Sequence, residues 1–444
     1  MQASLGWIHM PMARRLARRS VALVLGGTVA LAAPALARAQ TTAPSADAPG
    51  FVHVWATAMD TAGAPRAVRR GVVLLTVDVR DGSPTRGRIV HTLLAADTAG
   101  RDAHHTEHAL ADDGLLFAND FGAGRTYRFD LRTPGAPRLT GDFTTAGPFG
   151  YPHSFVRLPN GNVLTTFQRA ATGPSPGGLV EVRRDGTPVR WASAAAPGLG
   201  AAEIQPYSLE VIPALDRVVL TSTSMVADIG VHVQIWRLSD LTLLHTIPIP
   251  EASPSEAAAP HAGHGAASDS VDVQPRHLFP GEPRLLADGR TVMLGTFTCG
   301  LYRLTGIDGD APRLEFTRAF PGRDCAVPVR IGQWWIQTVP ADRSVVALDV
   351  TDPARPREAG RLGFAAGVTP HWLAADASGT RLVMTSGSPS DPHLHLVRFD
   401  RTTGALAPDE TLPAVDLSRV DVAGLGIVRI VPHGSVFGAD GGRP

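Results

Sequence analysis

The sequence of 444 residues contains no lysine, so every one of its 41 basic residues other than histidine is an arginine. Without lysine, the chain has no side-chain amine that can form a Schiff base with a carbonyl substrate or with pyridoxal phosphate. A P-loop for nucleotide phosphates also requires a lysine, so that site is excluded as well. This absence removes several large enzyme classes before any motif is considered.

Net charge is also absent, because the 41 basic residues are matched by 41 acidic ones. A neutral chain gives no indication of a nucleic-acid partner or of an anionic membrane surface, both of which favour a basic excess. Long hydrophobic runs are missing too, since no stretch reaches the roughly 18 apolar residues that span a bilayer. We therefore expect neither nucleic-acid binding nor membrane insertion, and the composition does not indicate an oligomeric state.

The beginning of the chain has the pattern of a cleaved export signal. An arginine-rich start precedes an apolar segment at residues 21–31, and Ala37-Arg38-Ala39 provides a small-residue cleavage site. The pair Arg18-Arg19 is also compatible with a twin-arginine signal, which implies folding around a cofactor before export. We predict a signal peptide at residues 1–39, a flexible linker at residues 40–50, and a periplasmic or secreted protein.

Cysteine is scarce, with only Cys299 and Cys325 in the whole chain. Two thiols in an exported protein most often pair, so we predict a disulfide between them. A redox-active thiol and a metal ligand are the competing interpretations.

Aromatic residues make up only 6% of the chain, whereas glycine (46) and proline (37) are frequent, which is typical of many short strands joined by turns. A repeated unit supports this. It consists of an apolar strand, a turn containing Gly, Asn or Asp, a second strand ending in Thr or Ser, and two further strands. Clear copies occupy residues 152–183 and 370–400, and others start near His108, Tyr207, Glu282 and Cys325. The starts advance by about 45 residues, as the blades of a propeller do.

The two ends of the chain fit the closure of a ring. Residues 51–58, 71–78 and 88–94 resemble three outer strands of a blade that lacks its first strand, and residues 427–433 lead into a segment that can supply it. Pairing of the first and last segments removes the free sheet edges. We predict an all-β protein at residues 51–444, a seven-bladed β-propeller closed by its N- and C-terminal strands, with residues 251–273 as a low-complexity surface loop.

Histidine occupies one recurrent position in these repeats, at the expected head of the innermost strand: His108, His153, His371 and His433. In three copies an apolar residue follows two positions later, at Leu110, Phe155 and Leu373. Innermost strands of a ring all start near its axis, so these distant imidazoles are expected to converge. Neutral imidazoles with few carboxylates suit copper, iron or zinc rather than calcium or magnesium.

Two carboxylates also lie at blade starts, Glu107 and Glu282. They are candidate catalytic residues that orient imidazoles or accept protons. The alternative is that they are ordinary surface carboxylates. His261 and His264 resemble a short metal-binding tract, but they lie in the low-complexity segment.

Several segments, in order along the chain, resemble the selenium-binding protein / methanethiol oxidase family. They begin with Leu75-Thr-Val-Asp-Val79, Ser83-Pro84, Ile89-Val-His91 and the pair His104-His105. They continue with His153 and Gly161-Asn-Val-Leu164, Gly177-Gly-Leu-Val-Glu181, Val233-Gln-Ile-Trp236, Asp349-Val-Thr-Asp-Pro353, Arg355-Pro356 and His433. Each piece is a common propeller pattern, but their order together with the histidines is specific.

The resemblance implies a seven-bladed propeller and, for the oxidase members, copper enzymes that convert methanethiol and oxygen to formaldehyde, hydrogen sulfide and hydrogen peroxide. Carried over by position, the metal-binding histidines of the family fall on His104, His105, His153 and His433. The repeat register instead favours His108 in the first of these blades, so His104, His105 and His108 remain alternatives there. The predicted metal ligands are His105, His108, His153, His371 and His433.

The chain departs from the family pattern at three places. No cysteine follows the paired histidines, since residues 109–114 contain no sulfur, and residues 434–438 replace the cysteine-containing tail of the family. Selenium binding through cysteine is therefore not expected. The family has glutamine where this chain has His371, which adds one imidazole and indicates that the substrate need not be methanethiol.

The sequence therefore predicts an exported, copper-dependent oxidoreductase that oxidises a small thiol with O2 at a multi-histidine site. One alternative is an iron-dependent oxygenase with four histidine ligands, similar in arrangement to the carotenoid-cleaving oxygenases. The other is a non-catalytic propeller that binds metal or selenium or serves as an interaction platform.

Overall fold

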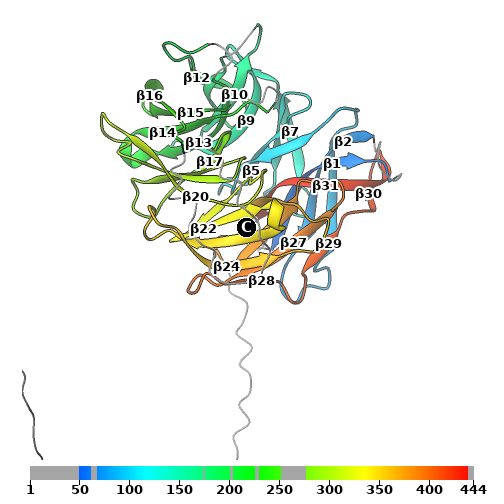
Figure 1. Ribbon diagram of the computed structural model, residues 1–444. Helices are drawn as coiled ribbons and strands as arrows, with labels where there is room; N and C mark the ends of the chain where they lie inside the picture. The colour runs from blue at the N-terminus through cyan, green and yellow to red at the C-terminus, as the bar shows by residue number, and fades with distance from the viewer. Residues whose placement is uncertain are drawn as a thin grey trace, which may run out of the picture. The chain divides into compact units, whose positions relative to one another are not determined.

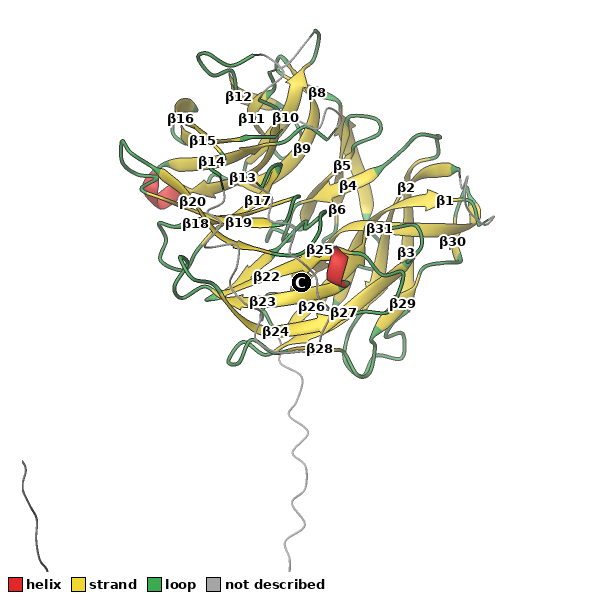
Figure 2. Ribbon diagram, viewed as in Figure 1, coloured by secondary structure: helices red, strands yellow, loops and turns green. Residues whose placement is uncertain are grey.

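The computed structural model describes residues 50–61, 68–173, 176–200, 204–225, 230–251 and 277–438. The predicted signal peptide and nearly all of the linker lie outside these residues, as does the low-complexity loop apart from Glu251. Within them, regular structure is entirely β except for two short 3-10 turns, η1 (Pro213–Leu215) and η2 (Pro340–Asp342) (Figure 2). None of the described segments is a helix of the length and apolarity needed to cross a membrane.

The described strands form seven sheets, which are the blades of a β-propeller (Figure 1). The closing blade contains β1 (Phe51–Met59), β2 (Arg69–Asp78), β3 (Ile89–Ala96), β30 (Val420–Val422) and β31 (Gly426–Gly438). The second blade contains β4 (Ala103–Thr106), β5 (Leu115–Asp120), β6 (Arg125–Asp130) and β7 (Arg138–Phe143). The third contains β8 (Thr145–Ala146), β9 (Phe149–Arg157), β10 (Val163–Ala170), β11 (Gly178–Val182) and β12 (Pro188–Ser193).

The remaining blades follow in chain order. The fourth contains β13 (Pro206–Ile212), β14 (Arg217–Ser222), β15 (His232–Arg237) and β16 (Thr242–Pro248). The fifth contains β17 (Pro280–Leu285), β18 (Val292–Thr296), β19 (Gly300–Thr305) and β20 (Arg313–Ala319). The sixth contains β21 (Val329–Ile331), β22 (Trp334–Val339), β23 (Ser344–Asp349) and β24 (Arg357–Gly363). The seventh contains β25 (Pro370–Ala375), β26 (Arg381–Ser386), β27 (His393–Phe399), β28 (Leu406–Pro408) and β29 (Ala414–Asp416).

The two ends of the described chain close the ring. Strand β31 pairs antiparallel with β1, so that Val52 lies opposite Phe437 and Ala58 opposite Ile430. Figure 1 shows this pairing as a red strand beside a blue one. The predicted seven-bladed, all-β fold with closure by its terminal strands is confirmed.

Apolar side chains fill every junction between neighbouring blades. Because successive residues of a strand point to opposite faces, each blade contributes one face to the preceding junction and the other to the next. In β1, Val54 packs against the seventh blade and Trp55 against the second. In β2, Leu75 packs against the seventh blade and Leu74 against the second. Strand β1 is buried along its full length, because it packs against a neighbouring blade on each face. A strand buried on both faces has a nearly continuous apolar sequence.

Six of the seven inner strands carry a bulge where they pair with the second strand of the blade. In five of them two residues of the inner strand lie opposite one residue of the second strand, and in the seventh blade one residue of the inner strand has no opposite residue. The bulged residues are His104-His105, His153-Ser154, Tyr207-Ser208, Gly281-Glu282, His371 and His433-Gly434. The described pairing of β21 with β22 has no such shift. A bulge bends the strand and redirects side chains, and bulges are frequent next to functional sites.

The second strand stabilises several of these bulges. The backbone N–H of His105 donates to Asn119 Oδ1 (2.6 Å), that of Ser154 to Thr166 Oγ1 (2.9 Å), and that of Ser208 to Thr221 Oγ1 (3.2 Å). Each amide displaced from the ladder therefore keeps a hydrogen-bond partner, as a buried N–H group must. The Thr or Asn near the end of the second strand in the repeat has this physical role.

The expected register of the second blade is wrong. His108 does not open the inner strand, because β4 is Ala103–Thr106 and His108 follows its end. Just beyond the strand, the N–H of Glu107 still donates to the carbonyl of Phe117 (3.1 Å), but the carboxylate of Glu107 accepts the N–H of Phe117 (2.9 Å) in place of a backbone carbonyl. The paired His104 and His105 occupy the inner strand instead.

Cys299 and Cys325 form a disulfide between the fifth and sixth blades, within the apolar junction that contains Met293 and Trp335. The bridge spans 26 residues of sequence, so replacing both cysteines with alanine should lower the free energy of unfolding by roughly 3–4 kcal/mol, the cost of freeing a loop of that length in the unfolded chain. Denaturant titration of the variant beside the parent measures this. An unchanged midpoint and slope in the variant would contradict it.

Candidate metal centre

Five histidines from four blades meet at the bulges of the inner strands. Nε2 of His104 lies 3.0 Å from Nε2 of His153, and Nε2 of His371 lies 3.0 Å from Nε2 of His433. The rings of His104 and His433 are 4.4 Å apart, and those of His104 and His105 stack at 4.3 Å, so the two pairs form one cluster. The expected convergence of distant imidazoles is therefore present in the structure.

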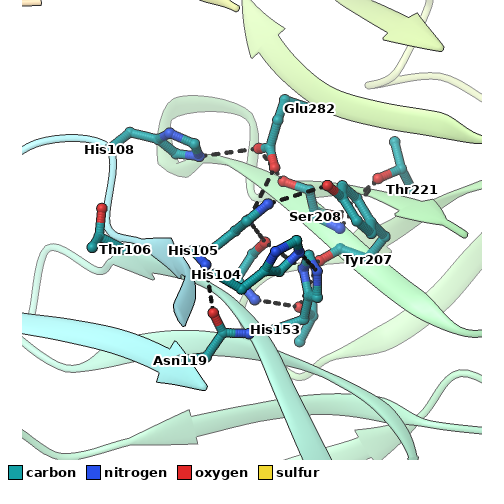
Figure 3. Close-up of polar contacts among 12 residues, drawn as sticks. His104, His105, Thr106, His108, Asn119, His153, Tyr207, Ser208, Thr221 and Glu282 are labelled. Carbon is teal, nitrogen blue, oxygen red and sulfur yellow. Dashed lines mark hydrogen bonds and ion pairs between the residues drawn. The ribbon is translucent and has the colours of Figure 1, made fainter. Parts of the chain in front are cut away.

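The cluster has a compact inner part and a more exposed outer part. One ring nitrogen each of His104, His105 and His153 lie within 4.8 Å of one another, and all three residues are buried. His371 and His433 are partly exposed, so solvent reaches the cluster from their side. Figure 3 shows the inner imidazoles gathered beside Tyr207 and Glu282.

The bulge in β4 explains how two consecutive histidines join one cluster. In a regular strand, neighbouring side chains point to opposite faces, so only one of the pair would reach it. The extra residue at His104-His105 removes this alternation, and the amide of His105 bonds to Asn119 instead of to the ladder. Asn119 also donates from Nδ2 to the carbonyl of Pro152 (3.1 Å), which ties the bulges of the second and third blades together.

Hydrogen bonds determine which nitrogen of His153 is free. Its Nδ1 donates to the carbonyl oxygen of Tyr207 (2.8 Å), because a carbonyl can only accept. The proton is therefore on Nδ1, and the Nε2 that faces His104 carries the lone pair. A histidine that donates one ring N–H to a backbone carbonyl and directs the other nitrogen inward is the usual arrangement of a metal ligand.

His105 is held in a comparable way by polar groups from other blades. Its Nδ1 lies 3.3 Å from Ser154 Oγ and 3.5 Å from Glu282 Oε1, and its Nε2 lies 3.2 Å from the hydroxyl of Tyr207 (Figure 3). Burial keeps this phenol protonated, since it raises the pKa of Tyr207 well above 10. The neutral hydroxyl contacts Nε2 of His105 and orients the ring, and the tautomer of His105 determines which of the two groups donates.

The five imidazoles are neutral at physiological pH. Burial lowers the pKa of His153 and of His371 to about 4. Burial, and secondarily the other imidazoles, lowers the pKa of His104, His105 and His433 well below 6.5. Neutral imidazoles keep a lone pair, which is the form that binds a metal ion.

Glu282 is the carboxylate beside the cluster. Its Oε2 accepts hydrogen bonds from His108 Nε2 (3.0 Å) and from the hydroxyl of Ser208 (Figure 3). It also accepts one from Arg284 Nη1 (3.1 Å). Burial would raise its pKa, but His108, Arg284 and Ser208 outweigh burial and lower it to about 2. Burial and Arg284 also lower the pKa of His108 despite the carboxylate, so the permanent positive charge beside Glu282 belongs to Arg284.

His108 lies outside the inner group of imidazoles. Nε2 of His108 donates to Glu282, and Nη2 of Arg284 lies 3.2 Å from both nitrogens of the His108 ring. The same ring stacks on Trp372, with the ring centroids 5.0 Å apart. His108 is also not among the three histidines whose donor atoms lie within 4.8 Å of one another. In this arrangement His108 supports Glu282. His104 occupies the position in the cluster that the repeat register assigned to His108.

Glu107 is buried in a salt bridge with Arg157, whose Nε lies 2.6 Å from Oε1. Burial raises the pKa of Glu107 to about 7, although Arg157 and the N–H of Phe117 lower it in part. In the described part of the chain its polar contacts are with Arg157 and Phe117 and none is with a histidine. Its catalytic role stays a prediction.

The contacts around the cluster include residues that the sequence did not single out for this role: Tyr207, Ser154, Ser208, Arg284 and Trp372. Tyr207-Ser208 and Glu282 were recognised as blade starts, which is the signal that places them here. The remaining candidates, His261 and His264, lie outside the described residues.

The donor set fits a transition metal ion. Two buried polar atoms at the cluster have no hydrogen-bond partner among the described residues, Nδ1 of His433 and Oε1 of Glu282. Closely spaced neutral imidazoles, among which His153 donates its outer N–H to a backbone carbonyl, match the preference of copper, iron and zinc.

Comparisons with known proteins agree with the fold and bear on the site. No protein-family model matches the chain. A methanethiol oxidase from Ruegeria pomeroyi is 27% identical over 180 residues, which cover 38% of this chain. The match spans only 39% of that relative's length.

Three solved structures show the same fold at low sequence identity. A hypothetical selenium-binding protein from Sulfolobus tokodaii has a TM-score of 0.64 and 13% identity over 89% of this chain and 95% of its own. The periplasmic gluconolactonase of Pseudomonas aeruginosa has a TM-score of 0.55 and 16% identity over 87% of this chain and 99% of its own. A putative 6-phosphogluconolactonase from Bacteroides uniformis has a TM-score of 0.53 and 13% identity over 87% of this chain and 98% of its own.

The fold and the cluster define a seven-bladed β-propeller with a candidate metal centre built on the bulges of its inner strands. Within this class, the matches confirm the resemblance seen in the sequence. Over part of its length the chain is similar to a methanethiol oxidase, and it shares its fold with a selenium-binding protein.

Proposed function

We propose that the chain is an exported, copper-dependent oxidoreductase that oxidises a small thiol with O2 at the histidine cluster. The observation that carries the proposal is the meeting of five neutral imidazoles from four blades, with His104 and His153 only 3.0 Å apart. The similarity to a methanethiol oxidase supports the thiol as the substrate class. Export rests on the signal pattern of residues 1–39.

His104, His105 and His153 are the proposed inner ligands, with His371 and His433 beside them. When bound, copper would supply a soft centre that accepts a sulfur ligand and exchanges electrons. Tyr207 holds His153 through its carbonyl and His105 through its hydroxyl. Rigid ligands held in this way need little rearrangement when a substrate arrives.

Glu282 contributes a fixed negative charge rather than a mobile proton. Its pKa of about 2 keeps it ionised, and a general base is most effective when its pKa is near the working pH. It therefore orients His108 and would compensate part of the positive charge of a bound cation. Trp372, which lies against both His105 and His108, keeps water from this side of the cluster.

Elemental analysis of protein recovered from the periplasm tests the proposal. We expect about one copper per chain at such a mononuclear site, lost on chelation together with thiol-dependent oxygen uptake and hydrogen peroxide formation. Iron in place of copper would favour the oxygenase alternative, which the all-imidazole donor set also suits. Folded protein that takes up neither metal would contradict both and favour an interaction propeller.

A further inference from the structure

We propose that Asp391, His393 and His395 form a second metal site, for a divalent transition cation such as zinc, on the seventh blade. This site is separate from the central histidine cluster. It does not depend on the proposed oxidase function.

The local sequence places the three side chains together. In the segment His393-Leu394-His395 of β27, the period of two puts both histidines on one face, while Leu394 is buried in the apolar junction with the closing blade. Asp391 precedes the strand by two residues and folds back onto this face. A His-x-His pair on one strand, with a carboxylate just before it, brings three donors into a small volume without distant partners.

The three donor groups already contact one another through hydrogen bonds, which a shared cation would replace. Oδ1 of Asp391 lies 2.6 Å from Nδ1 of His393, and Oδ2 lies 2.9 Å from Nε2 of His395. One donor atom from each of the three residues lies within 4.8 Å of the other two. Two imidazoles, one carboxylate and an open position for water are the donor set of zinc sites that keep one exchangeable ligand.

The environment leaves room for such an open position. The side chain of His393 is 39% exposed and that of His395 13%, whereas Asp391 is only 5% exposed. A buried carboxylate thus anchors the site from beneath, and the histidines face solvent. Opposite His395 on the neighbouring strand stands Ala414, whose small side chain does not cover the ring.

An outer carboxylate completes the arrangement. Asp416 is the cross-strand partner of His393, and its Oδ1 lies 4.0 Å from Nε2 of that ring. With Nδ1 directed at the cation, Nε2–H would face Asp416 across this 4.0 Å gap, and a carboxylate is a common outer partner of a metal-binding histidine. On the other side, the ring of His395 meets Phe364 edge-on with centroids 5.3 Å apart.

The site lies at the same end of the seventh blade as the central cluster. The loop between β26 and β27 begins at Gly387, where a Cβ atom would approach the ring of His371 to 2.9 Å, and ends at Asp391 and Pro392. A cation at Asp391 would fix the far end of this loop. The two sites remain distinct, because none of the three donors is among the contacts of His371 or His433 in the described residues.

Titration of the full chain, stripped of metal by chelation, with Co²⁺ and then Zn²⁺ tests the proposal. The visible absorption of bound Co²⁺ reports coordination, and elemental analysis after dialysis reports Zn²⁺ stoichiometry. We expect His393→Asn with His395→Asn to abolish one equivalent of binding, and this loss to persist in a background with His104→Asn and His153→Asn. Asp416→Asn should weaken the same equivalent by about 10-fold, as the loss of an outer partner does.

The matched control is His91→Asn with His245→Asn, which removes two half-buried strand histidines elsewhere. It should leave both stoichiometry and affinity unchanged. If the double variant at His393 and His395 does not fold, His393→Gln alone changes a side chain at the surface and should still weaken binding by about 10-fold or more. Unchanged Co²⁺ and Zn²⁺ binding in a folded variant, or an equal loss in the control, would overturn the proposal.

Discussion

Replacing both His104 and His153 with asparagine will remove the metal from the central cluster and abolish thiol-dependent oxygen uptake. Their Nε2 atoms lie 3.0 Å apart and supply two of the three most closely grouped donors. Loss of one outer-shell partner typically costs about 10–100-fold in metal affinity or activity, so loss of two ligands should exceed about 100-fold. The measurements are metal content per chain and kcat/KM for thiol oxidation.

Asparagine is chosen because its amide can still bond to the carbonyl of Tyr207, so that the fold is disturbed as little as possible. The matched control is His53→Asn, which replaces another buried histidine, bonded to Thr76 on β2 and outside the cluster. It should keep both metal and turnover. Full turnover in the double variant would refute the proposed site, and an equal loss in the control would attribute the effect to folding.

The architecture was predictable because a propeller repeats one local pattern. Each blade is built from sequential strands, so the strand spacing, the turn residues and the Thr or Ser at the end of the second strand recur along the chain. Closure was predictable for a related reason. Among the described residues no inner strand precedes residues 51–58, and the C-terminal strand β31 pairs with them in its place.

The exact ligands were less predictable, because bulges break the period of two on which the register depends. Counting from a regular strand places His108 at the head of the second inner strand, whereas the bulge at His104-His105 shifts the strand and directs both residues to the cluster. The side chain of Glu107 then replaces a backbone carbonyl as the acceptor for the N–H of Phe117. A bulge adds a residue without any distinctive sequence, so its position appears only in three dimensions.

The supporting residues were unpredictable for a different reason. The contact of Tyr207 with His105 joins residues 102 apart in sequence, and that of Glu282 with His108 joins residues 174 apart. Nothing local at either end of these pairs specifies the other. The disulfide was a simpler inference, because two cysteines leave one possible pair.

The metal-free protein will lose much of its stability as the pH falls from about 6.5 to about 4. The pKa of His153 is about 4 in the folded protein, against 6.5 in the unfolded chain. Between these values the unfolded chain binds the proton and the folded protein does not, so stability falls with pH. For the fully buried His153 this amounts to about 3 kcal/mol at the lower limit. His371 shifts in the same direction but is partly exposed and contributes less.

His104, His105 and His433 act in the same direction, since their pKa values are also lowered by burial. Each such group adds to the loss, so the metal-free protein should be markedly less stable at acid pH than at neutral pH. A bound cation opposes this, because a coordinated nitrogen cannot take up a proton.

Denaturant unfolding of the metal-free protein at neutral and acid pH measures the loss. His153→Asn should flatten the pH dependence and His245→Asn should not. A metal-free protein whose stability is equal at both pH values would show that these imidazoles are not buried together in the neutral form.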